Sequence, residues 1–234
     1  MGRITVACLD MAGTTVADDG SVLAAFRAAA AEFGLTPGVP GYAEAIAFVQ
    51  DTMGQSKIEV FRQLLGSEDR AVRGNQIFEE SYAESVRAGL VTALPGAVQT
   101  IMALRAGGIR VCLCTGFAPA TRDAVLDALG WRPLIDLALS PADAGRGRPW
   151  PDLPLTALLR LRGGAVSELA VVGDTAADVE SGLRAGAGLV AGVTSGSASR
   201  EVLAAAGAPH ILDSVAGLVR LAGLEADVAP AAQP

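Results

Sequence analysis

Lys57 is the only lysine in this 234-residue chain, whose 18 basic side chains are otherwise all arginines. Arginine stays protonated in proteins, whereas lysine can lose its proton, and the neutral amine is a nucleophile. Because arginine supplies the other cations of the chain, a lysine in the segment MGQSK indicates amine chemistry. The alternative is a solvated helix residue that pairs with Glu59 or another acid.

Two carboxylates follow short apolar runs that are typical of buried strands. Asp10 ends the run ITVACLD, and Asp174 ends ELAVVGD, with Asp178 one helical turn later. The carboxyl ends of parallel strands meet at one sheet edge, so Asp10 and Asp174 are expected to lie together. Neighbouring carboxylates repel unless a cation lies between them, and Mg²⁺ prefers oxygen ligands, including substrate phosphoryl oxygens.

Two further residues could bind an anion at the same edge. Thr115, a hydroxyl next to Gly116, follows the apolar run IRVCLC, and Arg148 lies between Gly147 and Pro149. A hydroxyl with free backbone N–H groups binds anions, and a fixed guanidinium can hold one bidentately. Each feature alone has an ordinary explanation as a helix cap or turn, but four polar strand ends in this order predict a catalytic site.

The elements that would position these residues alternate between strand and helix. The apolar runs predict strands over 3–9, 109–114, 135–139, 168–173, 189–193 and 210–213, and helical patterns fall over 95–106, 119–129, 152–162, 176–185 and 198–206. Short, uniformly apolar strands between helices are typical of a parallel sheet covered on both faces. The predicted fold class is therefore α/β.

One stretch breaks the alternation. Residues 18–92 contain only helical segments, which predicts an all-helical insert between core segments 1–17 and 93–226. The terminal, proline-containing segment 227–234 is expected to be disordered.

Composition and net charge favour a folded protein whose partner is neither nucleic acid nor a membrane. Apolar residues make up 51% of the chain, enough for a sizeable core, and the net charge of −7 argues against nucleic acid or an anionic membrane as partner. Neither a signal peptide nor a long apolar span is evident. Cys8, Cys112 and Cys114 lie in apolar runs, as expected of buried thiols in a reducing cytoplasm. We expect Cys112 and Cys114 to point to opposite strand faces, which disfavours a metal site there.

With these residues in place, the chain resembles the haloacid dehalogenase superfamily. DMAGTT is similar to its first motif, Thr115 to its second, Arg148 to its third and GDTAAD to its fourth. The resemblance implies a Rossmann-like core with a helical cap at 18–92. It also implies Asp10 as the nucleophile of an aspartyl-phosphate intermediate, with Mg²⁺ held by Asp10, the Ala12 carbonyl and Asp174, and with Asp178 as a supporting carboxylate.

Ala12 restricts the resemblance to one branch of the superfamily, because the phosphatases of the superfamily carry an acid–base aspartate at that position. Alanine there, the cap motif Met53-Gly54-x-x-Lys57 and the segment GRPWP are similar to phosphonoacetaldehyde hydrolase, or phosphonatase. In that branch the cap lysine forms a Schiff base with the substrate aldehyde before the P–C bond breaks. The substrate-binding residues implied are Met53, Gly54, Thr14, Gly116 and Phe117.

Two positions depart from the phosphonatase pattern. Val60 and Phe117 stand where that family has a histidine and a tyrosine, so the substrate stays open between phosphonoacetaldehyde and a related carbonyl phosphonate. One alternative is a phosphatase of small phosphate monoesters in which Lys57 only binds phosphate. Another is a ligand-sensing protein on a degenerate hydrolase fold. The resemblance also implies a homodimer through the cap.

Overall fold

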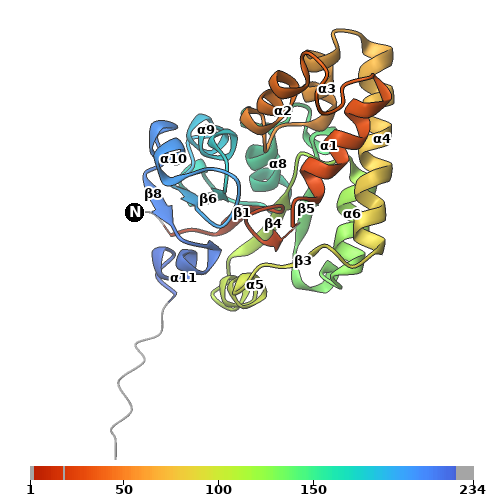
Figure 1. The fold of residues 1–234 in the computed structure, drawn as a ribbon. Helices are drawn as coiled ribbons and strands as arrows, with labels where there is room; N and C mark the ends of the chain where they lie inside the picture. Colours follow the sequence, from red (N-terminus) through yellow and green to blue (C-terminus); the bar gives the residue numbers. More distant parts are fainter. Residues whose placement is uncertain (1–2, 18, 225–234) are drawn as a thin grey trace, which may run out of the picture.

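The protein, represented by a computed structural model, is described over residues 3–17 and 19–224. Its centre is a six-stranded parallel sheet in the order β5–β4–β1–β6–β7–β8 (Figure 1). The strands are β1 (Val6–Asp10), β4 (Arg110–Cys114), β5 (Leu137–Leu139), β6 (Leu169–Gly173), β7 (Leu189–Val193) and β8 (His210–Leu212). The prediction of six strands in an α/β fold is confirmed, with each strand end within three residues of its expected place.

Helices cover both faces of this sheet, which is why its strands are apolar throughout (Figure 1). Successive side chains of β1 alternate between two cores: Leu9 packs in the cluster that contains Leu104 of α5, and Val6 in the cluster that contains Leu153 of α8. The helices of this part are α5 (Ala97–Ala106), α6 (Pro119–Ala128), α7 (Pro141–Ala144), α8 (Asp152–Arg160), α9 (Ala176–Arg184), α10 (Arg200–Ala205) and α11 (Leu218–Leu221).

The stretch between β1 and β4 holds four further helices, of which α4 lies beside α6 (Figure 1). They are α1 (Ser21–Glu32), α2 (Tyr42–Asp51), α3 (Lys57–Leu65) and α4 (Glu68–Arg87), and we call them the helical insert. The rings of Phe26, Phe61 and Phe78 form its centre, with centroids 4.7–6.2 Å apart. The exact division into core and cap stays a prediction, and the tail 227–234 lies outside the described residues.

A short antiparallel ladder that the sequence did not predict flanks the helical insert. β2 (Val16–Ala17) pairs with β3 (Thr92–Ala93), so the chain leaves and re-enters the sheet domain at one place. Strands of two residues are too short to show alternation in a sequence.

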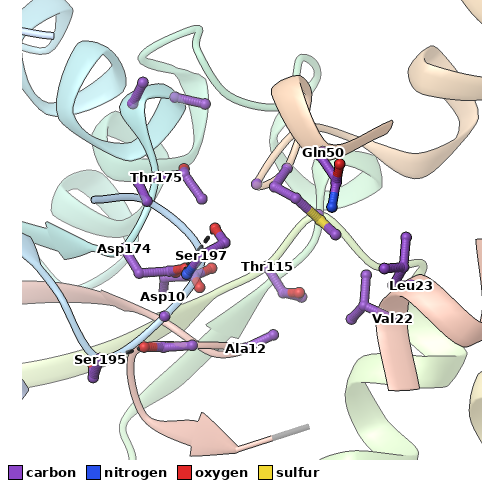
Figure 2. A pocket seen from close by; sticks show the side chains of 18 of the residues that line it. Asp10, Ala12, Val22, Leu23, Gln50, Thr115, Asp174, Thr175, Ser195 and Ser197 are labelled. Atoms are coloured by element: carbon purple, nitrogen blue, oxygen red, sulfur yellow. Dashed lines mark hydrogen bonds between the residues drawn. The ribbon is translucent and has the colours of Figure 1, made fainter. Parts of the chain in front are cut away.

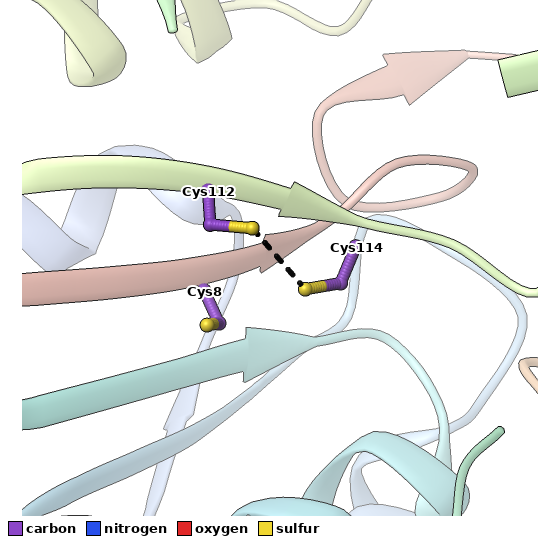
Figure 3. A group of neighbouring side chains, drawn as sticks. All are labelled: Cys8, Cys112 and Cys114. Carbon is purple, nitrogen blue, oxygen red and sulfur yellow. Dashed lines mark hydrogen bonds between the residues drawn. The ribbon is translucent and has the colours of Figure 1, made fainter. Parts of the chain in front are cut away.

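The three cysteines are free and buried, as expected, but the expectation that Cys112 and Cys114 point to opposite strand faces is wrong. Cys112 and Cys114 are two residues apart on β4, and side chains at that spacing point to the same face of a strand. Their Sγ atoms lie 3.7 Å apart, and Cys8 on the neighbouring β1 is the register partner of Cys112 (Figure 3).

Among the described residues, no helix combines the length and the apolar character that crossing a bilayer requires.

We predict that Leu104→Ala lowers the free energy of unfolding by about 2–5 kcal/mol, because it removes a buried side chain from the packed face of α5. Leu104 is 0% exposed, whereas Met102 on the same helix is 57% exposed, so Met102→Ala is the matched control, with an expected change below about 0.5 kcal/mol. Urea denaturation measures both. Equal losses in the two variants would contradict the assigned packing of α5.

Candidate active site

Asp10 lies at the carboxyl end of β1 and is almost fully buried. The turn after it is closed by the backbone N–H groups of Thr14, Thr15 and Val16, which all donate to the carbonyl of Met11. The Thr15 hydroxyl donates to the Asp10 carbonyl at 2.8 Å. The backbone around the carboxylate is therefore rigidly held, as a positioned nucleophile requires.

Arg148 bridges two carboxylates behind this turn. Its Nη1 donates to Asp10 Oδ1 at 2.6 Å and also to Asp178 Oδ1. The guanidinium is buried and does not line the large cavity of the site, and bidentate binding of a substrate anion by Arg148 stays a prediction. The contacts that the structure shows orient Asp10.

Asp178 lies in the first turn of α9, where it has two roles. Its Oδ2 accepts from the backbone N–H and the hydroxyl of Thr175, forming a capping box, while Oδ1 faces Arg148. The ordinary explanation of this aspartate as a helix cap is therefore correct for one of its oxygens.

Asp174, after β6, is held from two loops. Thr14 Oγ1 donates to Oδ1 at 3.2 Å, and the backbone N–H and hydroxyl of Ser197 donate to Oδ2 at 2.7 and 3.0 Å. A Cβ at Gly13 or Gly196 would lie within 2.5 Å of this carboxylate, so only glycine fits at both positions. Ser197 was missed in the sequence, where the polar run TSGSAS after a predicted strand was its only signal.

Asp10, Asp174 and Asp178 form one acidic cluster, in which carboxylate oxygens lie within 4.8 Å of one another (Figure 2 labels the first two). Burial raises the pKa of Asp10 well above its usual range; the charge of Arg148 opposes this shift, and the charges of Asp178 and Asp174 add to it. Burial and the Asp178 charge raise the pKa of Asp174 to about 6. Three buried carboxylates thus face one guanidinium, and this excess of hard oxygen donors fits a divalent cation such as Mg²⁺.

The loop between α2 and α3 of the helical insert lies directly on this edge of the sheet. Gly54 has a φ of 83°, and a Cβ there would lie 2.4 Å from Thr175 Oγ1. A Cβ at Gly116 would lie 2.2 Å from the carbonyl oxygen of Gln55, and the Lys57 backbone N–H donates to the Gly116 carbonyl at 3.2 Å. Glycine at 54 and 116 is what allows the insert to reach the catalytic edge.

Lys57 begins α3 and is 5% exposed. Its Nζ lies 5.6, 6.0 and 5.7 Å from the ring centroids of Phe26, Phe78 and Phe117. Lys57 is buried and Glu59 pairs with Arg62, so the alternative is wrong for a solvated lysine and for Glu59 as its partner. Its other part, an interaction with another acid of the helical insert, is supported by the charge interaction between Lys57 and Glu79.

Glu79 of α4 is an acid near Lys57 that the sequence did not single out. Its carboxylate accepts from the Ala118 N–H at 3.2 Å and from the Thr121 hydroxyl, so it ties the helical insert to the start of α6. Burial raises the pKa of Glu79, and these hydrogen bonds and the charge of Lys57 oppose the shift. A mid-helix glutamate gives no sequence signal that separates it from a surface residue.

A cavity of about 850 Å³ lies between the sheet edge and the helical insert. Acidic and hydroxyl groups line one side of it, and Val22 and Leu23 of α1 line the other (Figure 2). Most of the site residues predicted from the sequence line it: Asp10, Ala12, Met53, Gly54, Lys57, Thr115, Gly116, Phe117 and Asp174. Thr14 contacts Asp174 instead, and Arg148 and Asp178 lie behind Asp10.

Comparisons with known proteins identify the family and the fold of the chain. A family model for haloacid dehalogenase-like hydrolases matches residues 4–186. A phosphonoacetaldehyde hydrolase of Bacteroides fragilis is 30% identical over 206 residues, covering 79% of this chain and 74% of that protein. A phosphoglycolate phosphatase of Rhodospirillum rubrum is 36% identical over 142 residues, covering 60% of this chain and 57% of that protein. The structure is similar to a phosphonoacetaldehyde hydrolase-like protein from Oleispira antarctica, with a TM-score of 0.81, 26% identity and coverage of 95% and 92%.

We predict that Asp174→Asn raises the free energy of unfolding of the metal-free protein at neutral pH, because the variant has no buried carboxylate to ionise at this position. The pKa of Asp174 is raised from 3.8 to about 6, so its contribution to stability is present below about pH 4 and is lost as the pH rises through about 6. Relative to wild type, the variant should gain on the order of 1–3 kcal/mol between about pH 4 and pH 7.5. Urea denaturation with a chelator present measures this. A stability difference that stays constant with pH would contradict the prediction.

Proposed function

The chain belongs to the haloacid dehalogenase-like hydrolases, and from this premise we propose that it is a Mg²⁺-dependent hydrolase that acts at phosphorus through Asp10. The observation that carries the proposal is the placement of Asp10: a buried carboxylate that lines the large cavity, is oriented by Arg148 and belongs to the acidic cluster.

The metal ion has a defined set of ligands in this proposal. Asp10, Asp174 and the backbone carbonyl of Ala12 would hold Mg²⁺, with Asp178 as a supporting carboxylate. When bound, the ion neutralises charge on the cluster and on the transferring phosphoryl group.

Asp10 attacks phosphorus and takes the phosphoryl group as an aspartyl-phosphate, which water then hydrolyses to release phosphate. Thr115 is placed to bind the phosphoryl oxygens. Its Oγ1 accepts from the Phe117 backbone N–H at 3.2 Å, so its own proton is free to point to an anion in the cavity.

The substrate that we propose is a carbonyl phosphonate, phosphonoacetaldehyde or a relative of it. At Ala12 the chain has no acid to protonate an alkoxide leaving group, and Lys57 lines the same cavity as Asp10. The Lys57 amine condenses with the substrate carbonyl and releases water. When Asp10 attacks phosphorus, the electrons of the P–C bond pass to the imine, and the resulting enamine is protonated and hydrolysed to the carbonyl product.

Burial of Lys57 among three phenylalanine rings keeps bulk water away from such an imine. This is the structural support for the Schiff base, besides the likeness to phosphonoacetaldehyde hydrolases.

A second candidate is a phosphatase of small phosphate monoesters, in which Lys57 binds phosphate as a cation. The apolar Val60 and Phe117 favour it, since both stand where phosphonatases have hydrogen-bonding side chains. The likeness to a phosphoglycolate phosphatase also supports it. In either case the partner is a small molecule, and a homodimer through the helical insert stays a prediction.

We predict that borohydride traps phosphonoacetaldehyde on Lys57, because reduction of an imine leaves a stable secondary amine. Peptide mass spectrometry should find the adduct on Lys57 in wild type and none in Lys57→Arg, which keeps the charge but cannot form the imine. If wild type releases phosphate from esters and forms no adduct, the phosphatase is the correct function.

We predict that Asp10→Asn lowers phosphate release by at least about 10³-fold for every substrate of the enzyme, because the variant lacks the nucleophile. Thermal unfolding with and without Mg²⁺ is the folding control and tests the metal site. Mg²⁺ should raise the Tm of wild type and have little effect on Asp174→Asn. Full activity in Asp10→Asn would overturn the proposed chemistry.

A further inference from the structure

A second donor cluster lies beneath the acidic one and is made of sulfur instead of oxygen. It consists of Cys8 on β1 and of Cys112 and Cys114 on β4, the three cysteines of the chain (Figure 3). Their Sγ atoms all lie within 4.8 Å of one another, and those of Cys112 and Cys114 are 3.7 Å apart. Adjacent parallel strands with one shared face bring three thiols to one point.

The surroundings of this thiol cluster are apolar. It is buried within a core that includes Leu139, Leu153 and Leu158. A dry site with sulfur donors excludes Mg²⁺ and other hard ions and selects soft ones.

Polar groups border the cluster on one side. Cys8 and Cys114 line a small cavity of about 10 Å³ together with Arg148, Asp10, Asp178 and Ser181. The charge of Arg148 acts on both thiols, and the charge of Asp178 opposes it at Cys114. Arg148 uses Nη1 for Asp10 and Asp178, whereas its buried Nε and Nη2 have no hydrogen-bond acceptor among the described residues. Two buried N–H donors next to this cavity therefore lack an acceptor, and an anionic group bound at the thiols would add negative charge on their side.

We propose that Cys8, Cys112 and Cys114 bind one Cu(I) ion in a trigonal site. A metal–sulfur bond of about 2.3 Å places the three ligands of a trigonal ion roughly 4.0 Å apart, which lies within the range of the cluster. Zn²⁺ fits less well, because its structural sites have four ligands and this cluster offers three. Cu(I) is a soft ion that thiolates select.

Binding of Cu(I) releases protons from the thiols and places charge next to Arg148. Each thiol that ligates releases its proton to solvent, and the copper keeps its oxidation state. The anionic complex lies across a small cavity from Arg148, the residue that orients Asp10. Cys114 is also the register partner of Asp10 on the adjacent strand. Copper binding therefore acts on the nucleophile through the residue that positions it.

The test is anaerobic competition for Cu(I) between the full chain and a chromogenic Cu(I) chelator under a reductant. Copper is offered to the native chain and, in parallel, during refolding from urea, so that burial of the site does not decide the result. We expect one copper per wild-type chain and an X-ray absorption spectrum with three sulfur neighbours. In the triple variant with Ala at 8, 112 and 114, retained copper should fall at least tenfold.

Far-ultraviolet circular dichroism shows whether the triple variant folds, and Met102→Ala, which leaves all thiols in place, is the matched control that should retain copper. The wild-type result decides the proposal even if the triple variant does not fold. Failure of wild type to take copper from the chelator, or a spectrum with oxygen or nitrogen neighbours, would overturn it. Since this binding is measured without any substrate, its outcome is independent of the proposed hydrolysis.

Discussion

The ion pairs of Arg148 are the interactions on which the rest of the site depends. One buried guanidinium joins the end of β1, through Asp10, to the first turn of α9, through Asp178. Removing one partner of a buried pair typically costs about 3–5 kcal/mol, because the other charge is left without compensation. These two ion pairs therefore fix the position of Asp10 relative to helix α9. Any cation that enters the acidic cluster competes with this guanidinium for the same carboxylates.

The close approach of the loop before α3 to the loops at the sheet edge is the second constraint on the site. It explains why residues of the helical insert line the cavity. Gly54 and Gly116 allow the loop before α3 to touch the catalytic edge, and a Cβ at Gly147 would lie 2.9 Å from Ser56 Cβ. This packing places the Lys57 amine and the Asp10 carboxylate on the same cavity. The walls of this cavity therefore come from both the helical insert and the sheet.

The sequence predicted those features that follow from strand position. Asp10, Thr115 and Asp174 were placed correctly because each ends an apolar run, and the ends of parallel strands must converge. The orientation of Arg148 could not be predicted, since a loop residue can approach a carboxylate from the cavity or from behind it. Ser197 and Glu79 carry no local pattern, and their roles arise only from contacts made across the fold. The error over Cys112 and Cys114 was one of strand geometry, and residues two apart share a face.

The ladder of β2 and β3 has a consequence for motion. The helical insert is joined to the sheet by two neighbouring strands of two residues each, so both of its connections lie on one short line. Short connections of this kind are where hinge rotations between parts of a protein take place. A rotation there would change the distance between Lys57 and Asp10. The three carboxylates of the acidic cluster all lie outside the helical insert, so their mutual contacts would be kept.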